Sequence, residues 1–504
     1  MENYYLSFDA GTQSVKVTVY NAAMECVAKS SNKTTLSYPQ PGWVNMNADE
    51  YLSLAKQGMK ECSEQLRQKH IDLHAVKAIM GDGIICGIVG IDAQAHAITP
   101  YINYLDSRTE ADAVVLKEQN LTVWGEETGN PEPRCMFPAM HARWLLTHHE
   151  GFQQHGTKFV HNAPYILMNL AGLASSDAFI DWGTLSGWGL GYNIMQKKWS
   201  DTQLTILGID KNYLPHIVKP WDIIGTLSTA SAAETGFPAG IPICAGAGDT
   251  MQSMLGSGIT APGKAVDVAG TCAMFCVSTS GIIPALSQKG SGLIFNSGTL
   301  PDTYFYWGFV RTGGLALRWF KDNICQKPED DRYYTALSKK AAAIAPGCKG
   351  VLFLPYLTGG YGTYADIRAS FMNMTMDTDQ FILWRAVLEA IAYDYLEVTD
   401  TYRRAGIRID RITITEGGSK DDLWNQIKAD VIGSETSTLH DAGGALLTNA
   451  VLAAYAAGNI KDLRHQLLQH QTPAKTYTPD KTNTKIYRQQ YSRQKEILHK
   501  LSGK

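Results

Sequence analysis

The sequence lacks a paired cysteine framework. Its 504 residues include nine cysteines, an odd number, and none of them stands in a Cys-x-x-Cys pair. Scattered single cysteines are typical of reduced thiols in a cytosol rather than of disulfides or zinc sites. The His-x-x-x-His pair of His70 and His74 has no Glu beside its first member. We therefore expect a surface position for this pair and no catalytic metal on histidine.

Long apolar runs and a large excess of one charge are also absent. Hydrophobic residues make up 44% of the chain, and the formal net charge is -3. No stretch reaches the roughly 18 apolar residues of a membrane helix. The N-terminus has no basic segment before an apolar run, so we expect no secretory signal and a cytoplasmic protein. The composition favours neither nucleic acid nor a membrane as partner, and the length predicts at least two domains.

Alternating apolar residues predict strands at two places in the chain. Residues 4–8 and 15–20 indicate a β-hairpin around a polar turn at 9–14. A strand, a Gly/Thr turn and a second strand recur at 265–278. This recurrence is weak evidence for a duplicated architecture. Further expected elements are a helix capped by Asn47 with Glu50 three residues on, strands at 75–80, 241–245, 351–354 and 412–415, and helices at 251–255, 379–404, 442–457 and from 482.

The first strand-end turn carries residues that suit a phosphate. Gly11 permits close backbone approach, while Thr12 and Ser14 add hydroxyl donors, with Gln13 and Lys16 nearby. A carboxylate at the end of the strand, Asp9, can hold Mg²⁺ through water. A plain Asp-Gly hairpin turn is the alternative interpretation.

A second strand-end turn, Gly-x-Gly-Asp at 246–249, places Asp249 at the start of a helix. The helix dipole there favours the ionised carboxylate, which can accept a hydroxyl proton during phosphoryl transfer. Taken alone, Asp249 could equally be an N-cap. Gly270 with Thr271, and Gly417 with Gly418, end two later strands, and ordinary turns would explain either pair.

Two other features favour structural roles. The segment 258–265 nearly spells a P-loop, but it lacks a Ser or Thr after Lys264 and precedes a strand, so we interpret it as a surface turn. Trp182, Trp188 and Trp199 could line a sugar site, and we expect core positions for at least two of them.

The order of these turns along the chain resembles the FGGY family of carbohydrate kinases, and the resemblance covers nearly the whole sequence. Further matching segments are 41–44, 106–109, 355–359, 385–389 and 417–430. The resemblance implies an α/β fold of two actin-like, ribonuclease H-like ATPase domains of the sugar kinase/Hsp70/actin type, with an interdomain cleft. We place the sugar-binding domain at 1–244, the ATP-binding domain at 245–475 and a helical tail at 476–504, with a compact hinge near 242–246.

The resemblance also implies roles for individual residues. Asp249 matches the general base, and ATP and Mg²⁺ are the implied cofactors, with Mg²⁺ near Asp9. The first phosphate loop matches Gly11, Thr12, Gln13, Ser14 and Lys16, the second matches Gly270 and Thr271, and the adenosine contact matches Gly417 and Gly418. The expected sugar-site residues are Ile84, Ile85, Cys86, Asp106, Asp249 and Thr250.

One departure from the family bears on the substrate. Xylulose kinases carry Gly-Gln-Met-His-Gly, and glycerol kinases Asn-Gln-Arg-Glu, where this chain has Ile84, Ile85 and Cys86 between two glycines. A hydroxyl facing this apolar wall would lose hydrogen bonds worth about 1–3 kcal/mol. These residues could instead be simply core.

The sequence therefore predicts ATP-dependent phosphorylation of a ketose such as xylulose or ribulose, or of a related polyol. Within this class a deoxy-sugar, glycerol or another polyol is the alternative substrate. Outside it, an actin- or Hsp70-like ATPase and a sugar sensor are the alternatives. A homodimer is one assembly that the sequence leaves open.

Overall fold

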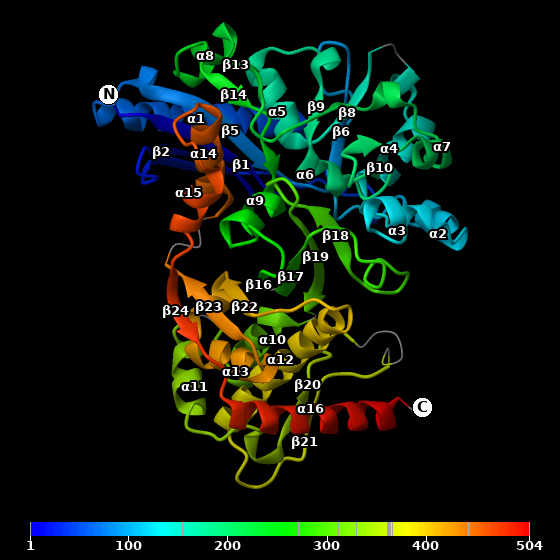
Figure 1. Ribbon diagram of the computed structural model, residues 1–504, viewed down its shortest axis with the longest axis vertical. Helices are drawn as coiled ribbons and strands as arrows, with labels where there is room; N and C mark the ends of the chain where they lie inside the picture. Colours follow the sequence, from blue (N-terminus) through cyan, green and yellow to red (C-terminus); the bar gives the residue numbers. More distant parts are fainter. Residues whose placement is uncertain are drawn as a thin grey trace. The chain divides into compact units, whose positions relative to one another are not determined.

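The structure, a computed structural model, describes residues 2–153, 156–270, 273–310, 312–328, 330–359, 364, 366–440 and 444–502. The chain divides into two compact units that alternate along the sequence (Figure 1). The first unit comprises Met1–Gly256, Ser280–Phe305 and Gly443–His470. The second unit comprises Ser257–Thr279, Tyr306–Ala442 and Gln471–Lys504.

A mixed sheet forms the centre of the first unit. Its strands run in the order β13-β14-β5-β1-β2-β3, with β15 beside β5, and a smaller sheet has the order β4-β7-β6-β8. Strand β1 pairs antiparallel with β2 and parallel with β5, so the predicted hairpin is confirmed. The bounds are β1 (Tyr4–Ala10), β2 (Ser14–Asn21), β3 (Cys26–Lys33), β4 (Asn45–Met46), β5 (Val76–Gly83), β6 (Gly87–Ile91), β7 (Tyr101–Asn103), β8 (Lys158–Val160), β9 (Phe179–Asp181), β10 (Tyr192–Asn193), β11 (Lys198–Trp199), β12 (His216–Val218), β13 (Ile223–Thr226), β14 (Pro242–Cys244), β15 (Ala247–Gly248) and β18 (Ile294–Ser297).

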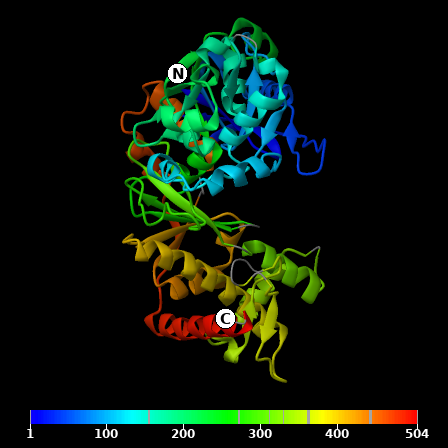
Figure 2. The same ribbon diagram turned by 90° about the vertical axis from the view of Figure 1, so that its right-hand side faces the viewer.

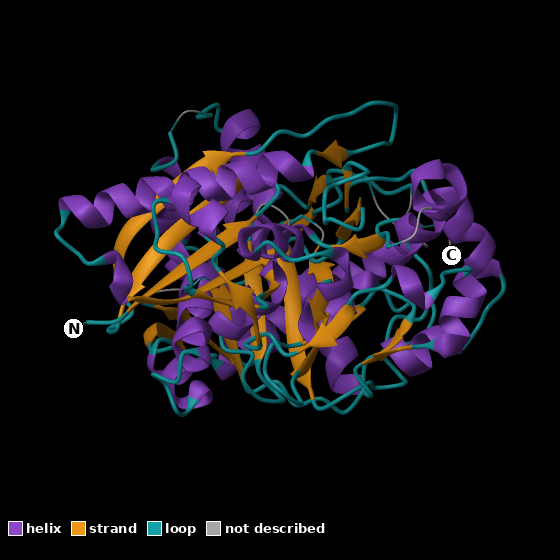
Figure 3. Ribbon diagram, turned by 90° about the horizontal axis from the view of Figure 1, so that it is seen from above, coloured by secondary structure: helices purple, strands orange, loops and turns teal. Residues whose placement is uncertain are grey.

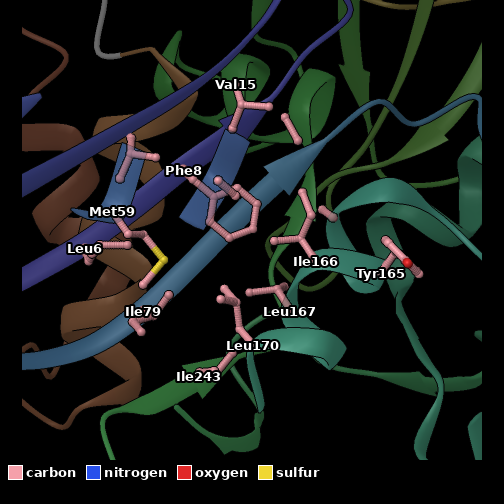
Figure 4. Close-up of a cluster of buried hydrophobic side chains, with 14 of the residues drawn as sticks. Leu6, Phe8, Val15, Met59, Ile79, Tyr165, Ile166, Leu167, Leu170 and Ile243 are labelled. Carbon is pink, nitrogen blue, oxygen red and sulfur yellow. The ribbon is translucent and has the colours of Figure 1, made fainter. Parts of the chain in front are cut away.

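Helices cover both faces of this sheet, and Figure 3 shows strands lying between helices. Leu6 and Phe8 of β1 pack in one core cluster with α1, whereas Tyr5 packs in a second cluster with α14. Figure 4 shows Leu6, Phe8, Met59 and Ile79 in the first cluster. Both sets of alternating residues in β1 are therefore buried, and each fully buried side chain of this size contributes about 1.5–3 kcal/mol. The α-helices are α1 (Ala48–Gln68), α2 (Glu110–Glu118), α3 (Val123–Thr128), α4 (Pro138–His148), α5 (Asn162–Ala171), α6 (Trp182–Leu185), α7 (Asp201–Leu207), α8 (Thr229–Thr235), α9 (Asp249–Gly256), α14 (Ala445–Ala456) and α15 (Leu463–Gln469).

The second unit repeats the strand pattern of the first. Strand β16 pairs antiparallel with β17 and parallel with β22, as β1 does with β2 and β5. The sheet continues in the order β16-β22-β23-β24. This shared topology agrees with the duplicated architecture that the recurring turns indicated. The strands are β16 (Ala265–Ala269), β17 (Ala273–Thr279), β19 (Tyr304–Val310, which begins in the first unit), β20 (Leu352–Leu354), β21 (Ser370–Met372), β22 (Arg411–Thr415), β23 (Glu435–Leu439) and β24 (Pro473–Tyr477).

A buried arginine of α12 binds a carboxylate on its own helix and a tyrosine on the tail helix α16. Arg385 Nε donates to Glu389 Oε1 at 2.8 Å, and Arg385 Nη2 donates to the Tyr487 hydroxyl at 2.8 Å. The tail helix therefore packs on the body of the unit, as Figure 2 also shows. The helices are α10 (Gly313–Trp319), α11 (Tyr333–Ala341), α12 (Gln380–Arg404), α13 (Asp422–Ile432) and α16 (Lys481–Leu501).

The predicted domains are continuous ranges of sequence, whereas each compact unit is made of three separate segments. Strand β14, which the sequence analysis placed at a hinge, is a strand of the first sheet, and the chain leaves the first unit at Gly256. Residues 443–470 then return to the first unit. The segments 1–244, 245–475 and 476–504 stay a prediction about the two domains and the tail.

Three local predictions are confirmed: the cap of α1, the buried tryptophans and the exposed histidine pair. Asn47 caps α1 by accepting hydrogen bonds from the Asp49 and Glu50 amides. Trp182 and Trp188 are buried, while Trp199 is partly exposed against Trp188. His70 and His74 are exposed, and every described cysteine is unpaired. Among the described helices, none is both long and apolar enough to cross a membrane.

Candidate active site

Three aspartates lie at the ends of adjacent strands in the first unit. Asp9 on β1 is the register partner of Asp82 on β5, and Ala247 on β15 is also a partner of Asp82. Asp249 follows β15 directly and is the first residue of α9. Carboxyl ends of neighbouring parallel strands form the usual ligand crevice of open α/β sheets. The arrangement brings the predicted base and the predicted metal residue to one sheet edge.

The surroundings of Asp249 raise the pKa of its carboxyl group and fix its orientation. Its Oδ1 accepts hydrogen bonds from the Thr250 amide at 2.5 Å and the Thr250 hydroxyl at 3.1 Å. Burial raises the pKa of Asp249 to about 7, the charge of Asp9 adds to the rise, and backbone hydrogen bonds from Thr250 and Ile85 oppose it. A base with a pKa near the operating pH is effective in proton transfer. Thr250, expected at the sugar, orients this carboxylate.

Asp82 is a residue that the sequence reasoning missed. Its side chain is fully buried, its Oδ2 accepts a hydrogen bond from Asn449 at 2.5 Å, and its Oδ1 has no hydrogen-bond partner. Burial raises the pKa of Asp82 well above its usual range, and the charges of Asp9 and Asp249 add to the rise. The sequence signal that could have identified Asp82 is its position between two glycines just after a predicted strand.

The first phosphate turn is held by its neighbours. The Gly11 amide donates to the Ser14 carbonyl at 3.1 Å, which closes the turn, and Thr34 donates to the Thr12 carbonyl at 2.6 Å. Gln13 is exposed and Thr12 partly so. Lys16 Nζ lies 3.1 Å from Asp9 Oδ2, so the two side chains form an ion pair. The turn presents backbone and hydroxyl groups beside Asp9.

The apolar wall lies beside Asp249. A Cβ on Gly248 would stand 2.2 Å from Ile85 Cγ2, so Ile85 packs directly against the residue before Asp249. Cys86 Sγ contacts the Gly187 carbonyl at 3.5 Å. Ile84, Ile85 and Cys86 are 3%, 7% and 7% exposed, so little of each side chain reaches solvent. Such low exposure is typical of closely packed side chains. The role of these three residues in acceptor specificity stays a prediction.

Asp106 has its carboxylate engaged elsewhere. Its Oδ2 accepts from the Val44 amide at 2.6 Å and from Arg108 Nη2 at 2.8 Å, and its Oδ1 accepts from Arg108 Nε at 2.9 Å. The Arg108 guanidinium lies 4.0 Å from the centre of the Trp43 ring. These contacts favour a supporting role for Asp106 over the expected sugar contact.

The two glycine turns predicted for the nucleotide are neighbours within the second unit. Gly270 follows β16 and Gly417 follows β22, and Val268 and Thr415 are register partners at these strand ends. A Cβ on Gly418 would stand 2.5 Å from that of Ala269, so only glycine fits there. A Cβ on Gly417 would meet nothing within 4 Å, so its backbone is open to approach. Thr271 lies outside the described residues.

The strand-end carboxylates suit a cation that keeps its water. The Asp9 side chain is 15% exposed, and Asp82 Oδ1 is unpartnered. Among the described residues, no group of three or more His, Cys, Asp or Glu could hold a metal ion by itself. Mg²⁺ typically retains several waters and takes one or two carboxylates with substrate phosphates. Asp9, next to Asp82 on the neighbouring strand, fits this kind of Mg²⁺ binding.

Comparison with known proteins finds two matching family models and several relatives. Residues 4–256 match the model of the FGGY family of carbohydrate kinases, N-terminal domain, and residues 265–457 match its C-terminal domain. A xylulose kinase of Bacillus subtilis is 24% identical over 98% of this chain and 96% of its own length. A gluconokinase of the same organism is 26% identical over 91% of this chain and 89% of its own. A crystal structure of xylulose kinase from Rhodospirillum rubrum aligns over all of both chains with a TM-score of 0.87 at 22% identity.

Proposed function

Because the chain belongs to the FGGY family of carbohydrate kinases, we propose that it transfers the γ-phosphoryl group of ATP to a hydroxyl of a ketose such as xylulose or ribulose, or of a related polyol. The family makes it a phosphotransferase with an alcohol group as acceptor. The observation that carries the proposal is Asp249, a carboxylate at a helix start beside Asp9 with a pKa of about 7.

Asp249 acts on the acceptor hydroxyl. Its carboxylate takes the hydroxyl proton as the hydroxyl oxygen attacks the γ-phosphorus, and the bond to the β–γ bridging oxygen breaks to release ADP. The Thr250 hydrogen bonds to Oδ1 fix the orientation of the Asp249 carboxylate toward the acceptor. Ile84, Ile85 and Cys86 would exclude water on one side of the acceptor, which limits hydrolysis of ATP.

The nucleotide contacts come from the strand-end turns. In the first unit, amides and hydroxyls of Gly11, Thr12, Gln13 and Ser14 would bind phosphate oxygens, while Lys16 stays with Asp9. In the second unit, Gly270 with Thr271 would bind phosphate, and Gly417 and Gly418 would bind adenosine. Asp9 would hold a Mg²⁺ ion through water, and the bound ion would offset the charge of the phosphates.

An acceptor panel tests this function. Purified protein is incubated with ATP, Mg²⁺ and one of D-xylulose, D-ribulose, D-gluconate, glycerol or a deoxy-ketose, and ADP release is followed with mass analysis of the product. We expect at least one ketose or polyol to raise ADP release more than tenfold over ATP alone and to gain one phosphate. ATP turnover that no acceptor stimulates would contradict the proposal and favour an ATPase of the same fold.

A further inference from the structure

A chain of buried polar side chains ends at Asp82. The Thr299 hydroxyl donates to Gln252 Oε1 at 2.8 Å, and Gln252 Nε2 donates to Asn449 Oδ1 at 2.6 Å. Asn449 Nδ2 donates in turn to Asp82 Oδ2 at 2.5 Å. All four side chains are buried in the first unit. Each group donates in the same direction, so the bonds polarise one another and Asp82 is the final acceptor.

This network of hydrogen bonds contacts every element that carries an active-site carboxylate. Gln252 lies on α9, three residues after Asp249, and therefore close to one helical turn along. Asn449 also donates to the Phe8 carbonyl at 3.2 Å, one residue before Asp9 on β1. Asp82 is the β5 register partner of Asp9. Three hydrogen bonds, all made by Asn449, thus join the end of β1, the end of β5 and the first turns of α9.

Packing alone does not require these polar groups. Asn449 lies among Leu447, Ala450 and Val451 on α14, which is otherwise largely apolar. Replacing both partners of a buried hydrogen bond by apolar groups of the same shape can be nearly neutral or stabilising. Fully bonded amides in an apolar interior instead favour a single arrangement of the elements that they join.

We propose that Asp82, Asn449 and Gln252 are positioning residues that hold Asp9 and Asp249 at one fixed separation. The inference rests on the proposed function, because the fixed separation matters only if both carboxylates serve one reaction. Thr299 completes the arrangement by donating to Gln252, and Trp182 Nε1 donates to the Thr299 carbonyl at 3.0 Å. Displacement of catalytic groups by about 1 Å can cost on the order of 10²-fold in rate.

Kinetics of matched variants test the proposal. We expect Gln252→Leu and Asn449→Leu to lower kcat about 10- to 10²-fold, with KM for ATP and acceptor changed less than about threefold, because positioning acts mainly on the transition state.

The matched control is the variant Gln203→Leu. Gln203 is equally buried in the first unit and is bonded to the Gly191 amide, Glu127 and the Tyr192 carbonyl. The Gln203→Leu variant should have a lower Tm than wild type but should keep the wild-type kcat.

Two more conservative variants of Thr299 test the proposal if the leucine variants fail to fold. Thr299→Val removes the hydroxyl donor at nearly constant shape, whereas Thr299→Ser keeps it. We expect Thr299→Val to lower kcat several-fold and Thr299→Ser to retain the wild-type value. Equal kcat in these two variants, or wild-type kcat within twofold in both Gln252→Leu and Asn449→Leu, would overturn the positioning role.

Hydrogen exchange separates this proposal from the proposed function. Peptides covering 246–256 are followed by mass spectrometry in wild type, Gln252→Leu and Gln203→Leu. Faster exchange at the start of α9 in Gln252→Leu alone supports the network even if the wild type phosphorylates none of the acceptors tested. Exchange that is the same in both variants would show that the network does not hold this helix, whatever the kinase activity.

Discussion

The Thr250 amide donates to Asp249 Oδ1 at 2.5 Å, although the two residues are adjacent in sequence. The bond fixes one oxygen of a carboxylate whose pKa burial raises to about 7, with Asp9 adding to the rise. The side chain is thus held in orientation while its affinity for a proton is increased. This combination is typical of a group that accepts a proton during turnover.

The raised pKa predicts the pH dependence of the rate. The base must be ionised to act, so kcat/KM for the best acceptor should rise as pH increases through about 7 and then level off. A pH profile between 5 and 9 at saturating ATP measures this. An apparent pKa that stays near 4 would show that the carboxylate in the working enzyme is not perturbed in this direction.

The same shift predicts a change in stability with pH. The folded-state pKa of Asp249 lies above the unfolded value of 3.8, so the folded chain binds the proton more tightly. Its contribution to stability is full below about pH 4 and is lost as pH rises through about 7. Asp249→Asn, neutral throughout, should therefore gain more Tm over wild type at pH 8 than at pH 5. An equal Tm difference at both pH values would contradict this linkage.

The wall at Ile84, Ile85 and Cys86 predicts acceptor preference. An apolar wall discriminates weakly against a hydroxyl, by about 10²-fold at best, so less polar acceptors should be favoured while ordinary pentuloses retain activity. We expect Cys86→His to raise kcat/KM for D-xylulose relative to a deoxy analogue. A strong wild-type preference for D-xylulose that Cys86→His leaves unchanged would assign specificity to other residues.

The Arg385–Glu389 pair predicts a stability difference between buried and exposed charges. Arg385→Met leaves the Glu389 carboxylate buried without its cation, which costs about 3–5 kcal/mol. The matched control is Lys495→Met, which breaks the more exposed pair with Glu397 in the same unit and should cost about 0–1 kcal/mol. Urea unfolding measures both. Equal losses for the two variants would contradict the structural role assigned to Arg385.

The sequence predicted the turns that carry Asp9 and Asp249 because both follow strands with clear apolar patterns. It did not predict the role of Asn449, which looks like an ordinary residue of an Ala-rich helix. That role comes from a contact with Asp82, 367 residues away along the chain. The return of residues 443–470 to the first unit was likewise hidden, since no linker marks it. Asp106 stays a predicted sugar contact, and its ion pair with Arg108 could not be deduced from their spacing of two residues.

The most direct test of the account is the rate of phosphoryl transfer in Asp249→Asn, measured with the best acceptor at saturating ATP. The substitution keeps the size of the side chain and removes its ability to take a proton. The account predicts that kcat falls roughly 10²–10⁴-fold while ATP binding and the Tm at pH 5 stay close to wild type. A variant that phosphorylates the acceptor at nearly the wild-type rate would contradict the assignment of Asp249 as the base.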